Sequence, residues 1–145
     1  MILVVGGAGY IGSHLVKELV ETNEVVVLDN LSTGHRSLVD RRAHFVEGDL
    51  GDKAVLDKLF SNYPIEAVMH FAANSLVGES VQHPYKYYQN NVANTLTLLH
   101  SMIDHGVKNF IFSSTAATYG IPNVELIDEQ QPTHPINPYG RSKLM

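Results

Sequence analysis

The sequence contains no cysteine and no concentration of basic charge. Without cysteine there are no disulfide bridges and no thiolate chemistry, and such a composition suits a reducing compartment. Ten Lys and Arg stand against fifteen Asp and Glu, a formal net charge of −5 that is spread along the chain. A basic stripe is the minimum electrostatic footprint for nucleic acid, so no nucleic-acid partner is expected.

Long apolar runs and metal-ligand spacings are also missing from the chain. The apolar stretches fall well short of the roughly 20 residues that cross a bilayer. The N-terminus leads directly into a strand pattern, without a basic region and cleavage site. We therefore expect a cytoplasmic protein without a membrane partner. The eight His residues are not paired with carboxylates at a recognised ligand spacing, so no metal site is predicted.

What is present is a regular alternation of strand and helix patterns. Strands are predicted at residues 2–5, 25–28, 44–47, 67–71 and 109–112, and helices at residues 10–21, 53–60, 84–105 and from 138 onward. The Pro-rich residues 118–138 are predicted to form a loop. Such alternation favours an α/β fold with a doubly wound parallel sheet, a Rossmann-like domain. With 44% hydrophobic residues, we predict one domain over residues 1–145.

Three glycines, Gly6, Gly9 and Gly12, lie between the first predicted strand and the first predicted helix. Glycines let a backbone turn tightly and approach a pyrophosphate, and the N-terminus of the helix offers free N–H groups to the anion. The alternative is a tight strand-to-helix turn without a ligand. The strand, the glycines, the helix and a following acidic residue occur in the order of a dinucleotide-binding unit, which favours the ligand.

That acidic residue is Asp29, at the end of the second predicted strand and about twenty residues beyond the glycines. A carboxylate at this point accepts hydrogen bonds from the ribose hydroxyls of adenosine and repels a 2′-phosphate, which favours NAD over NADP. Arg36 nearby leaves NADP open, and an ordinary turn residue is the alternative for Asp29.

The GxxGxxG spacing resembles that of the extended short-chain dehydrogenase/reductase family. Further stretches match the family's motifs in the same order and extend the resemblance from residue 6 to residue 143. They are Asp29-Asn30-Leu31-Ser32, Gly48-Asp49-Leu50, His70-Phe71-Ala72-Ala73, Asn90-Asn91, Ser113-Ser114-Thr115 and Tyr139-Gly140-Arg141-Ser142-Lys143. The resemblance implies NAD as cofactor.

The residues that the resemblance places at the cofactor lie in the glycine turn, after the strands and on the last helix. They are Gly6, Gly9, Tyr10, Ile11, Gly12, Asp29, Asn30, Ser32, Asp49, Leu50, Phe71, Ala72, Ala73, Asn90, Ser113, Tyr139 and Lys143. Asp49 would lie beside the adenine, and plain packing is the alternative for Phe71.

Within the extended class, residues 77–81, 87–92 and 107–114 resemble the UDP-glucose 4-epimerase family most. That resemblance implies UDP-glucose and UDP-galactose as substrates. Related dehydratases carry an Asp-Glu pair where this chain has Ala116-Ala117, so the proton carriers for elimination are missing. The family often has Gly and Lys where this chain has Ala73 and Ser75, which puts one cofactor contact in doubt.

Tyr139 and Lys143 are four residues apart on a predicted helix and so project from one face. A free phenol titrates near pH 10, and a nearby ammonium lowers its pKa toward neutrality. By resemblance, Tyr139 takes the proton of the sugar O4, Lys143 holds the nicotinamide ribose, and Thr115 hydrogen-bonds the sugar. The implied reaction oxidises sugar C4 to a 4-keto intermediate and returns hydride to the opposite face. Taken singly, these residues suit a solvated helix face or a polar loop.

Other functions remain open at this point. Another extended-class enzyme acting on a nucleotide sugar, such as a decarboxylase, dehydratase or different epimerase, fits the same motifs, as does a non-catalytic NAD-binding module. The resemblance also implies a homodimer through the helix of residues 84–105 and the helix from Tyr139. The Tyr85, Tyr87 and Tyr88 cluster is predicted to pack rather than to stack on a base. Met145, the last residue of this sequence, is expected to lie inside the catalytic helix, with the substrate-binding portion of the protein beyond it. We expect residues 1–145 alone to show little turnover without that portion.

Overall fold

A computed structural model describes all residues from 1 to 145, and their contacts divide the chain into two compact units. The first unit comprises Met1–Ala72 and Asn94–Ser113, and the second comprises Ala73–Ala93 and Ser114–Met145. Our prediction of one domain over the whole chain stays a prediction.

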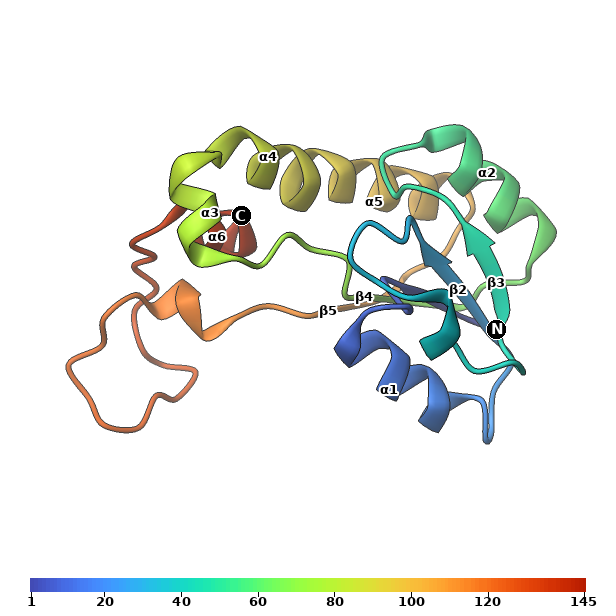
Figure 1. The fold of residues 1–145 in the computed structure, drawn as a ribbon, viewed down its shortest axis with the longest axis horizontal. Helices are drawn as coiled ribbons and strands as arrows, with labels where there is room; N and C mark the ends of the chain where they lie inside the picture. The colour runs from blue at the N-terminus through green and yellow to red at the C-terminus, as the bar shows by residue number, and fades with distance from the viewer. The chain divides into compact units, whose positions relative to one another are not determined.

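The first unit is built on a five-stranded parallel sheet in the order β3-β2-β1-β4-β5 (Figure 1). Its strands are β1 (Ile2–Val5), β2 (Val25–Asp29), β3 (His44–Glu47), β4 (Ala67–His70) and β5 (Asn109–Phe112). Val5 at the end of β1 is in register with Leu28 of β2 and with His70 of β4. The carboxyl ends of these strands therefore share one edge, and the predicted doubly wound parallel sheet is confirmed.

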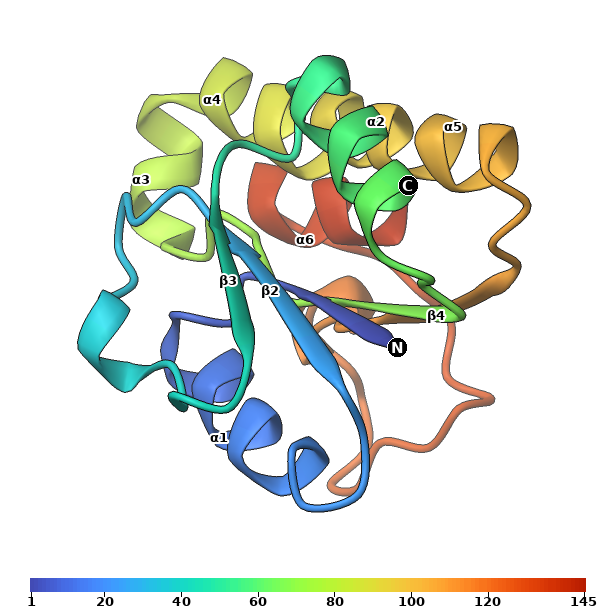
Figure 2. The same ribbon diagram turned by 90° about the vertical axis from the view of Figure 1, so that its right-hand side faces the viewer.

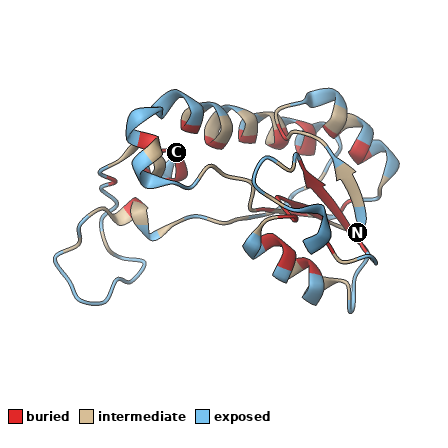
Figure 3. Ribbon diagram, in the orientation of Figure 1, coloured by how far each residue is buried: buried red, intermediate tan, exposed pale blue.

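Helices cover both faces of this sheet, as expected for a three-layer α/β arrangement (Figure 2). Helix α1 (Tyr10–Leu19) lies on one face, and α2 (Lys53–Asn62) and α5 (Thr95–Asp104) lie on the other. Strand β2 is buried along its whole length, whereas the edge strands β3 and β5 are only partly covered (Figure 3). Central parallel strands need this continuous run of aliphatic residues because both of their faces pack against helices.

Two apolar clusters hold the layers together. Leu3 and Leu28 pack with Leu56 of α2 and Leu98 of α5, and Val4 packs with residues of α1 on the opposite face. Successive residues of β1 therefore pack into different clusters, because successive side chains of a strand point to opposite faces of the sheet. Full burial of an aliphatic side chain of this size contributes about 1.5–3 kcal/mol.

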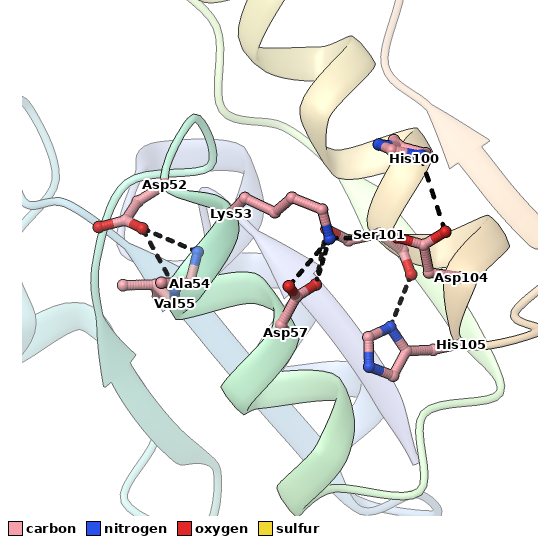
Figure 4. A network of polar contacts seen from close by, with 9 residues as sticks. All are labelled: Asp52, Lys53, Ala54, Val55, Asp57, His100, Ser101, Asp104 and His105. Atoms are coloured by element: carbon pink, nitrogen blue, oxygen red, sulfur yellow. Dashed lines mark hydrogen bonds and ion pairs between the residues drawn. The ribbon is translucent and has the colours of Figure 1, made fainter.

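A polar network joins α2 to α5 at the surface (Figure 4). Lys53 Nζ lies 2.8 Å from Asp57 Oδ1 on its own helix and 3.1 Å from Asp104 Oδ2 on α5. Asp52 caps α2, its Oδ1 accepting the N–H of Ala54 at 2.9 Å. The ion pairs are solvent-exposed, so each contributes little to stability.

The second unit consists of short helices and connecting loops. Its helices are α3 (Val77–Gln82), α4 (Pro84–Tyr88), the 3₁₀ helix η3 (Ala116–Tyr119) and α6 (Pro138–Leu144). Asn137 caps α6 by accepting the N–H of Gly140 at 2.8 Å. A Cβ on Gly140 would lie 2.5 Å from Ala117 O, so the start of α6 packs directly on η3.

The element boundaries differ from the predictions at several places. Helix α1 ends at Leu19, α2 continues to Asn62, and β4 ends at His70. The helix predicted over residues 84–105 is helical from Pro84 to Asp104, and Gln89–Asn94 forms a π-helical segment between α4 and α5. Helix α3 was not predicted because it has six residues and Leu76, which offers no capping side chain, at its N-cap. No helix combines the length and apolar character needed to cross a membrane.

Candidate functional site

The predicted phosphate-binding turn connects β1 to α1 in the first unit. Gly6 has a φ of +84°, and a Cβ there would lie 2.5 Å from the backbone nitrogen of Ala72. A Cβ on Gly12 would lie 2.2 Å from Gly6 O. Backbone conformation and close packing therefore require glycine at both positions. The clash at Gly6 also shows that Phe71 and Ala72, two predicted cofactor residues, lie against the turn.

Gly9 differs because nothing in the protein requires glycine there. A Cβ on Gly9 would meet only Gly6 O at 3.4 Å, and its φ of −79° suits any residue. Gly9 is the N-cap of α1 without a capping side chain, and no acidic residue lies in the first turn of the helix. Free N–H groups beside an open backbone form the cradle that a pyrophosphate needs. The turn thus fits the phosphates of a dinucleotide, and the exposed Tyr10 and Ile11 flank it.

Asp29 supports the turn with both carboxylate oxygens. Its Oδ2 accepts the N–H of Ala8 at 2.9 Å, and its Oδ1 accepts the N–H of Leu31 at 2.8 Å. The bond to Leu31 holds that residue at a positive φ of 56°, which places the following loop beside Ala8. A carboxylate offers about four acceptor sites, so capacity remains for ribose hydroxyls. The sequence did not reveal the contact with Ala8.

Asp49 and its neighbours occupy the same edge of the sheet, beyond β3. Asp49 Oδ2 accepts the side-chain N–H of Asn30 at 2.8 Å, and Asp49 Oδ1 accepts the N–H of Gly51 at 2.8 Å. Asn30 Oδ1 in turn accepts the N–H of Ser32 at 3.0 Å. These bonds preorganise the region predicted to hold the adenosine end of the cofactor.

Three predicted cofactor residues are tied into the framework of the first unit. Leu50 is 4% exposed and belongs to the apolar core, so only its backbone is available to a ligand. Ser113 continues the pairing of β5 with β4 by donating its N–H to His70 O at 3.1 Å. Phe71 packs its side chain against the cluster under α1. Their contact with a cofactor stays a prediction.

The predicted catalytic residues all lie in the second unit. Tyr139 and Lys143 are one turn apart on α6 and share a face of that helix. Thr115 is the N-cap of η3, its Oγ1 accepting the N–H of Ala117 at 3.2 Å. Because η3 packs on the start of α6, the fold brings the Thr115 segment to the helix that carries Tyr139.

Lys143 is almost completely buried, with 6% of its surface exposed. Burial disfavours the ammonium form and lowers the pKa of Lys143 to about 8. The side chain is therefore still charged at neutral pH, but it is poised near its titration point. Lys143 thus places a buried ammonium one turn from the phenol of Tyr139 on α6.

An amide network that the sequence did not reveal holds the backbone beside Tyr139. Asn91, which is buried, donates to Ser142 Oγ at 2.9 Å and to Asn74 O at 3.0 Å. Ser142 donates to Tyr139 O at 2.8 Å. Asn90 donates to Asn91 Oδ1 at 3.0 Å, so this predicted cofactor residue borders the network. Ala73 is half-buried, whereas Ser75, where the family often has Lys, is exposed.

The fold and the turn between β1 and α1 define a dinucleotide-binding domain of the Rossmann type. No group of three His, Cys, Asp or Glu side chains is arranged to hold a metal ion. The chain belongs to the NAD dependent epimerase/dehydratase family, whose sequence model matches residues 2–145.

Among known proteins, the chain is similar to several nucleotide-sugar epimerases. It is 57% identical to UDP-glucose 4-epimerase of Lactobacillus helveticus over 99% of this chain and 44% of that protein. It is 48% identical to UDP-arabinose 4-epimerase 1 of Arabidopsis thaliana over 99% of this chain and 37% of that protein. A solved UDP-glucose 4-epimerase from Brucella ovis in complex with NAD shows 53% identity and a TM-score of 0.95, covering 99% and 44% of the two chains. The chain thus spans less than half the length of these relatives.

Proposed function

We propose that the protein containing this chain interconverts UDP-galactose and UDP-glucose with NAD as its cofactor. The reaction oxidises the sugar at C4 to a 4-keto intermediate and returns hydride to the opposite face. The observation that carries the proposal is the pairing of Tyr139 with a buried Lys143 on one face of α6. The family match and the identity of 57% with a UDP-glucose 4-epimerase supply the substrate class.

NAD supplies a reversible hydride acceptor when it is bound. In the first unit, Gly9 and the N-terminus of α1 would hold its pyrophosphate, and Asp29 would accept its adenosine ribose hydroxyls. In the second unit, Lys143 would hold the nicotinamide ribose. Asn90 is proposed to line the nicotinamide side.

Tyr139 is proposed as the general base that removes the proton from the sugar O4, and Thr115 as a hydrogen-bond partner of the sugar oxygen. A base whose pKa lies near the working pH is effective in such a proton transfer. Ala116 and Ala117 carry no ionisable group, which disfavours the elimination of water by this segment.

Incubation of the full-length protein with UDP-galactose tests the proposal. We expect UDP-glucose to form, and we expect Tyr139→Phe to lower kcat by roughly 10²- to 10⁴-fold because the acid-base group is removed. Tyr63→Phe is the matched control, since Tyr63 follows α2 in the first unit and packs against its core. Bound NAD without formation of UDP-glucose would contradict the epimerase proposal and favour a non-catalytic NAD-binding module or another enzyme of the family.

A related epimerase activity is the second candidate, because the chain is 48% identical to a UDP-arabinose 4-epimerase. Both activities invert the same sugar carbon and would use the same Tyr139. A comparison of kcat/KM for UDP-galactose and UDP-arabinose decides between them. A higher kcat/KM for UDP-arabinose would make the pentose derivative, and not UDP-galactose, the preferred substrate.

We also propose a cytoplasmic homodimer. Leu96 and Ile103 are 60% and 75% exposed and lie two turns apart on α5, which gives this helix an apolar stripe suited to a partner. The lack of cysteine suits a reducing compartment. Sedimentation of the full-length protein as a monomer at micromolar concentration would contradict the dimer, and cell fractionation tests the location.

A further inference from the structure

Tyr87 of α4 is the largest fully buried side chain of the molecule, and its hydroxyl is held from two sides. The hydroxyl lies 2.7 Å from Glu79 Oε2 and 2.7 Å from Leu76 O, both of which are acceptors. It also accepts the N–H of Leu76 at 3.1 Å. The side chain therefore connects α4 to the first turn of α3 and to the residue before it.

The charges around Tyr87 keep its phenol neutral. Lys86 lies 2.6 Å from Glu79 Oε1, and this contact together with the bond from Tyr87 lowers the pKa of Glu79. Burial, followed by the neighbouring Glu79 carboxylate, raises the pKa of Tyr87 to about 12. Tyr87 thus keeps its proton and its anchor at any pH at which the enzyme would work.

The anchored ring of Tyr87 meets the ring of Tyr139. Their centroids are 6.4 Å apart and the ring planes are inclined by 77°, an edge-to-face arrangement. Tyr139 itself is half-buried, and α3 and α4 both contact α6. An edge-to-face contact constrains the orientation of both rings, because the positive edge of one ring is directed at the negative face of the other.

We propose that Tyr87, anchored by Glu79 and Leu76, is a positioning residue that fixes the ring of Tyr139 for proton transfer. This inference rests on the proposed function, in which Tyr139 is the base. Tyr139 turns about two side-chain bonds, and rotation about the first of them, Cα–Cβ, swings its hydroxyl to a new position. A displacement of about 1 Å at a reacting group can lower the rate by roughly 100-fold. Tyr87 would act through Tyr139 and would not touch the substrate.

Substitutions of Tyr87 in the full-length protein test this role. Tyr87→Leu removes the ring, and we expect kcat to fall roughly ten- to 100-fold with an unchanged KM for UDP-galactose. Tyr87→Phe keeps the ring but loses the hydroxyl anchor, so its kcat should lie between those of the wild type and Tyr87→Leu. The matched control is Tyr85→Phe, because Tyr85 lies on the same helix, is 76% exposed and donates its hydroxyl to Gln89 Oε1.

All rates are corrected for the folded fraction measured by circular dichroism, so that a loss of stability is not counted as a loss of positioning. Glu79→Gln keeps a neutral acceptor for Tyr87 and should fold well, with a kcat at or above that of Tyr87→Phe. A Tyr87→Leu protein whose corrected kcat equals that of the wild type would overturn the proposal. So would an equal loss of kcat in Tyr87→Phe and Tyr87→Leu, because the ring would then contribute nothing.

A second measurement does not depend on turnover. Tyrosines labelled with ¹³C at Cζ give one NMR signal each, and the signal of Tyr139 is identified by its loss in Tyr139→Phe. We expect one sharp Tyr139 signal in the wild type and a broadened or split signal in Tyr87→Leu. If the wild type has no epimerase activity, the proposed function fails, while this signal still decides whether Tyr87 fixes the ring. A signal that stays single and sharp in Tyr87→Leu would refute the positioning role.

Discussion

The glycine turn allows a sharp prediction, because Gly9 and Gly12 are three residues apart and differ in what surrounds them. In Gly12→Ala, the added Cβ would lie 2.2 Å from Gly6 O and 2.9 Å from Gly7 Cα. Backbone atoms cannot swing aside as a side chain can. In Gly9→Ala, the Cβ would meet only Gly6 O at 3.4 Å. We expect the first substitution to damage the fold and the second to damage only cofactor binding.

The magnitudes follow from these distances. Alanine is favoured over glycine inside a helix by about 1 kcal/mol, which acts in favour of Gly12→Ala. Overpacking against fixed neighbours costs about 1–3 kcal/mol, and a contact as short as 2.2 Å belongs at or beyond the upper end. The free energy of unfolding should therefore fall by about 2 kcal/mol or more in Gly12→Ala. Gly9→Ala should stay within about 0.5 kcal/mol of the wild type.

The assay is urea denaturation of the full-length protein, followed by circular dichroism with and without NAD. At 100 times its dissociation constant, a ligand stabilises the folded protein by about 2.7 kcal/mol. We expect the wild type to gain this increment. Gly9→Ala should lose most of it, because its methyl group would occupy the space left for the pyrophosphate.

Two outcomes would refute the reasoning. If Gly9→Ala without NAD is as unstable as Gly12→Ala, packing inside the protein requires glycine at both positions. Gly9 would then no longer indicate that a pyrophosphate binds at the turn. If Gly9→Ala gains the same increment from NAD as the wild type, the pyrophosphate does not approach the turn at this residue.

Three further predictions concern charged residues. The pKa of Lys143 is lowered to about 8 from an ordinary 10.5, so the folded protein binds fewer protons than the unfolded chain between these values, and stability rises with pH across this window. Urea denaturation without NAD measures this effect: relative to Lys143→Met, the wild type should gain stability from pH 8 to pH 10.5 and show no such gain below pH 8. An equal pH dependence of the two proteins would contradict the burial of this ammonium. Asp29→Asn places an amide NH₂ against the N–H of Ala8 or Leu31, which should cost about 1–3 kcal/mol, and it should raise the affinity for NADP relative to NAD, as measured by titration with both cofactors. Lys53→Met breaks only exposed ion pairs and should lower stability slightly, an effect that disappears in 1 M salt and that urea denaturation at low and high salt measures.

Local patterns were sufficient to predict most of the first unit. The apolar runs at β1 and β2 are long enough to be buried on both faces, and Gly6 to Gly12 stand where a strand must turn into a helix. Such signals are encoded by neighbouring residues, so they can be recognised in the sequence without knowledge of the rest of the fold. The boundaries were less secure, as β4 shows, because the end of a strand depends on its partners.

The second unit was predicted less completely, because its contacts join residues that are far apart in the sequence. Helix α3 has six residues and no capping side chain, and its stability comes from packing against α4 and α6. Tyr87 matched an ordinary amphipathic pattern, and nothing local distinguishes it from Tyr85. Only the tertiary structure shows that one is enclosed and the other exposed.

By itself, the sequence determined the order of strands and helices, the glycine turn with Asp29, and the spacing that puts Tyr139 and Lys143 on one helix face. The tertiary structure alone decided that Lys143 is buried, with a pKa lowered to about 8, and that Tyr87 meets Tyr139 edge to face. The physical reason is that periodicity and turn chemistry act over a few residues, whereas desolvation and ring packing depend on which distant segments the fold brings together.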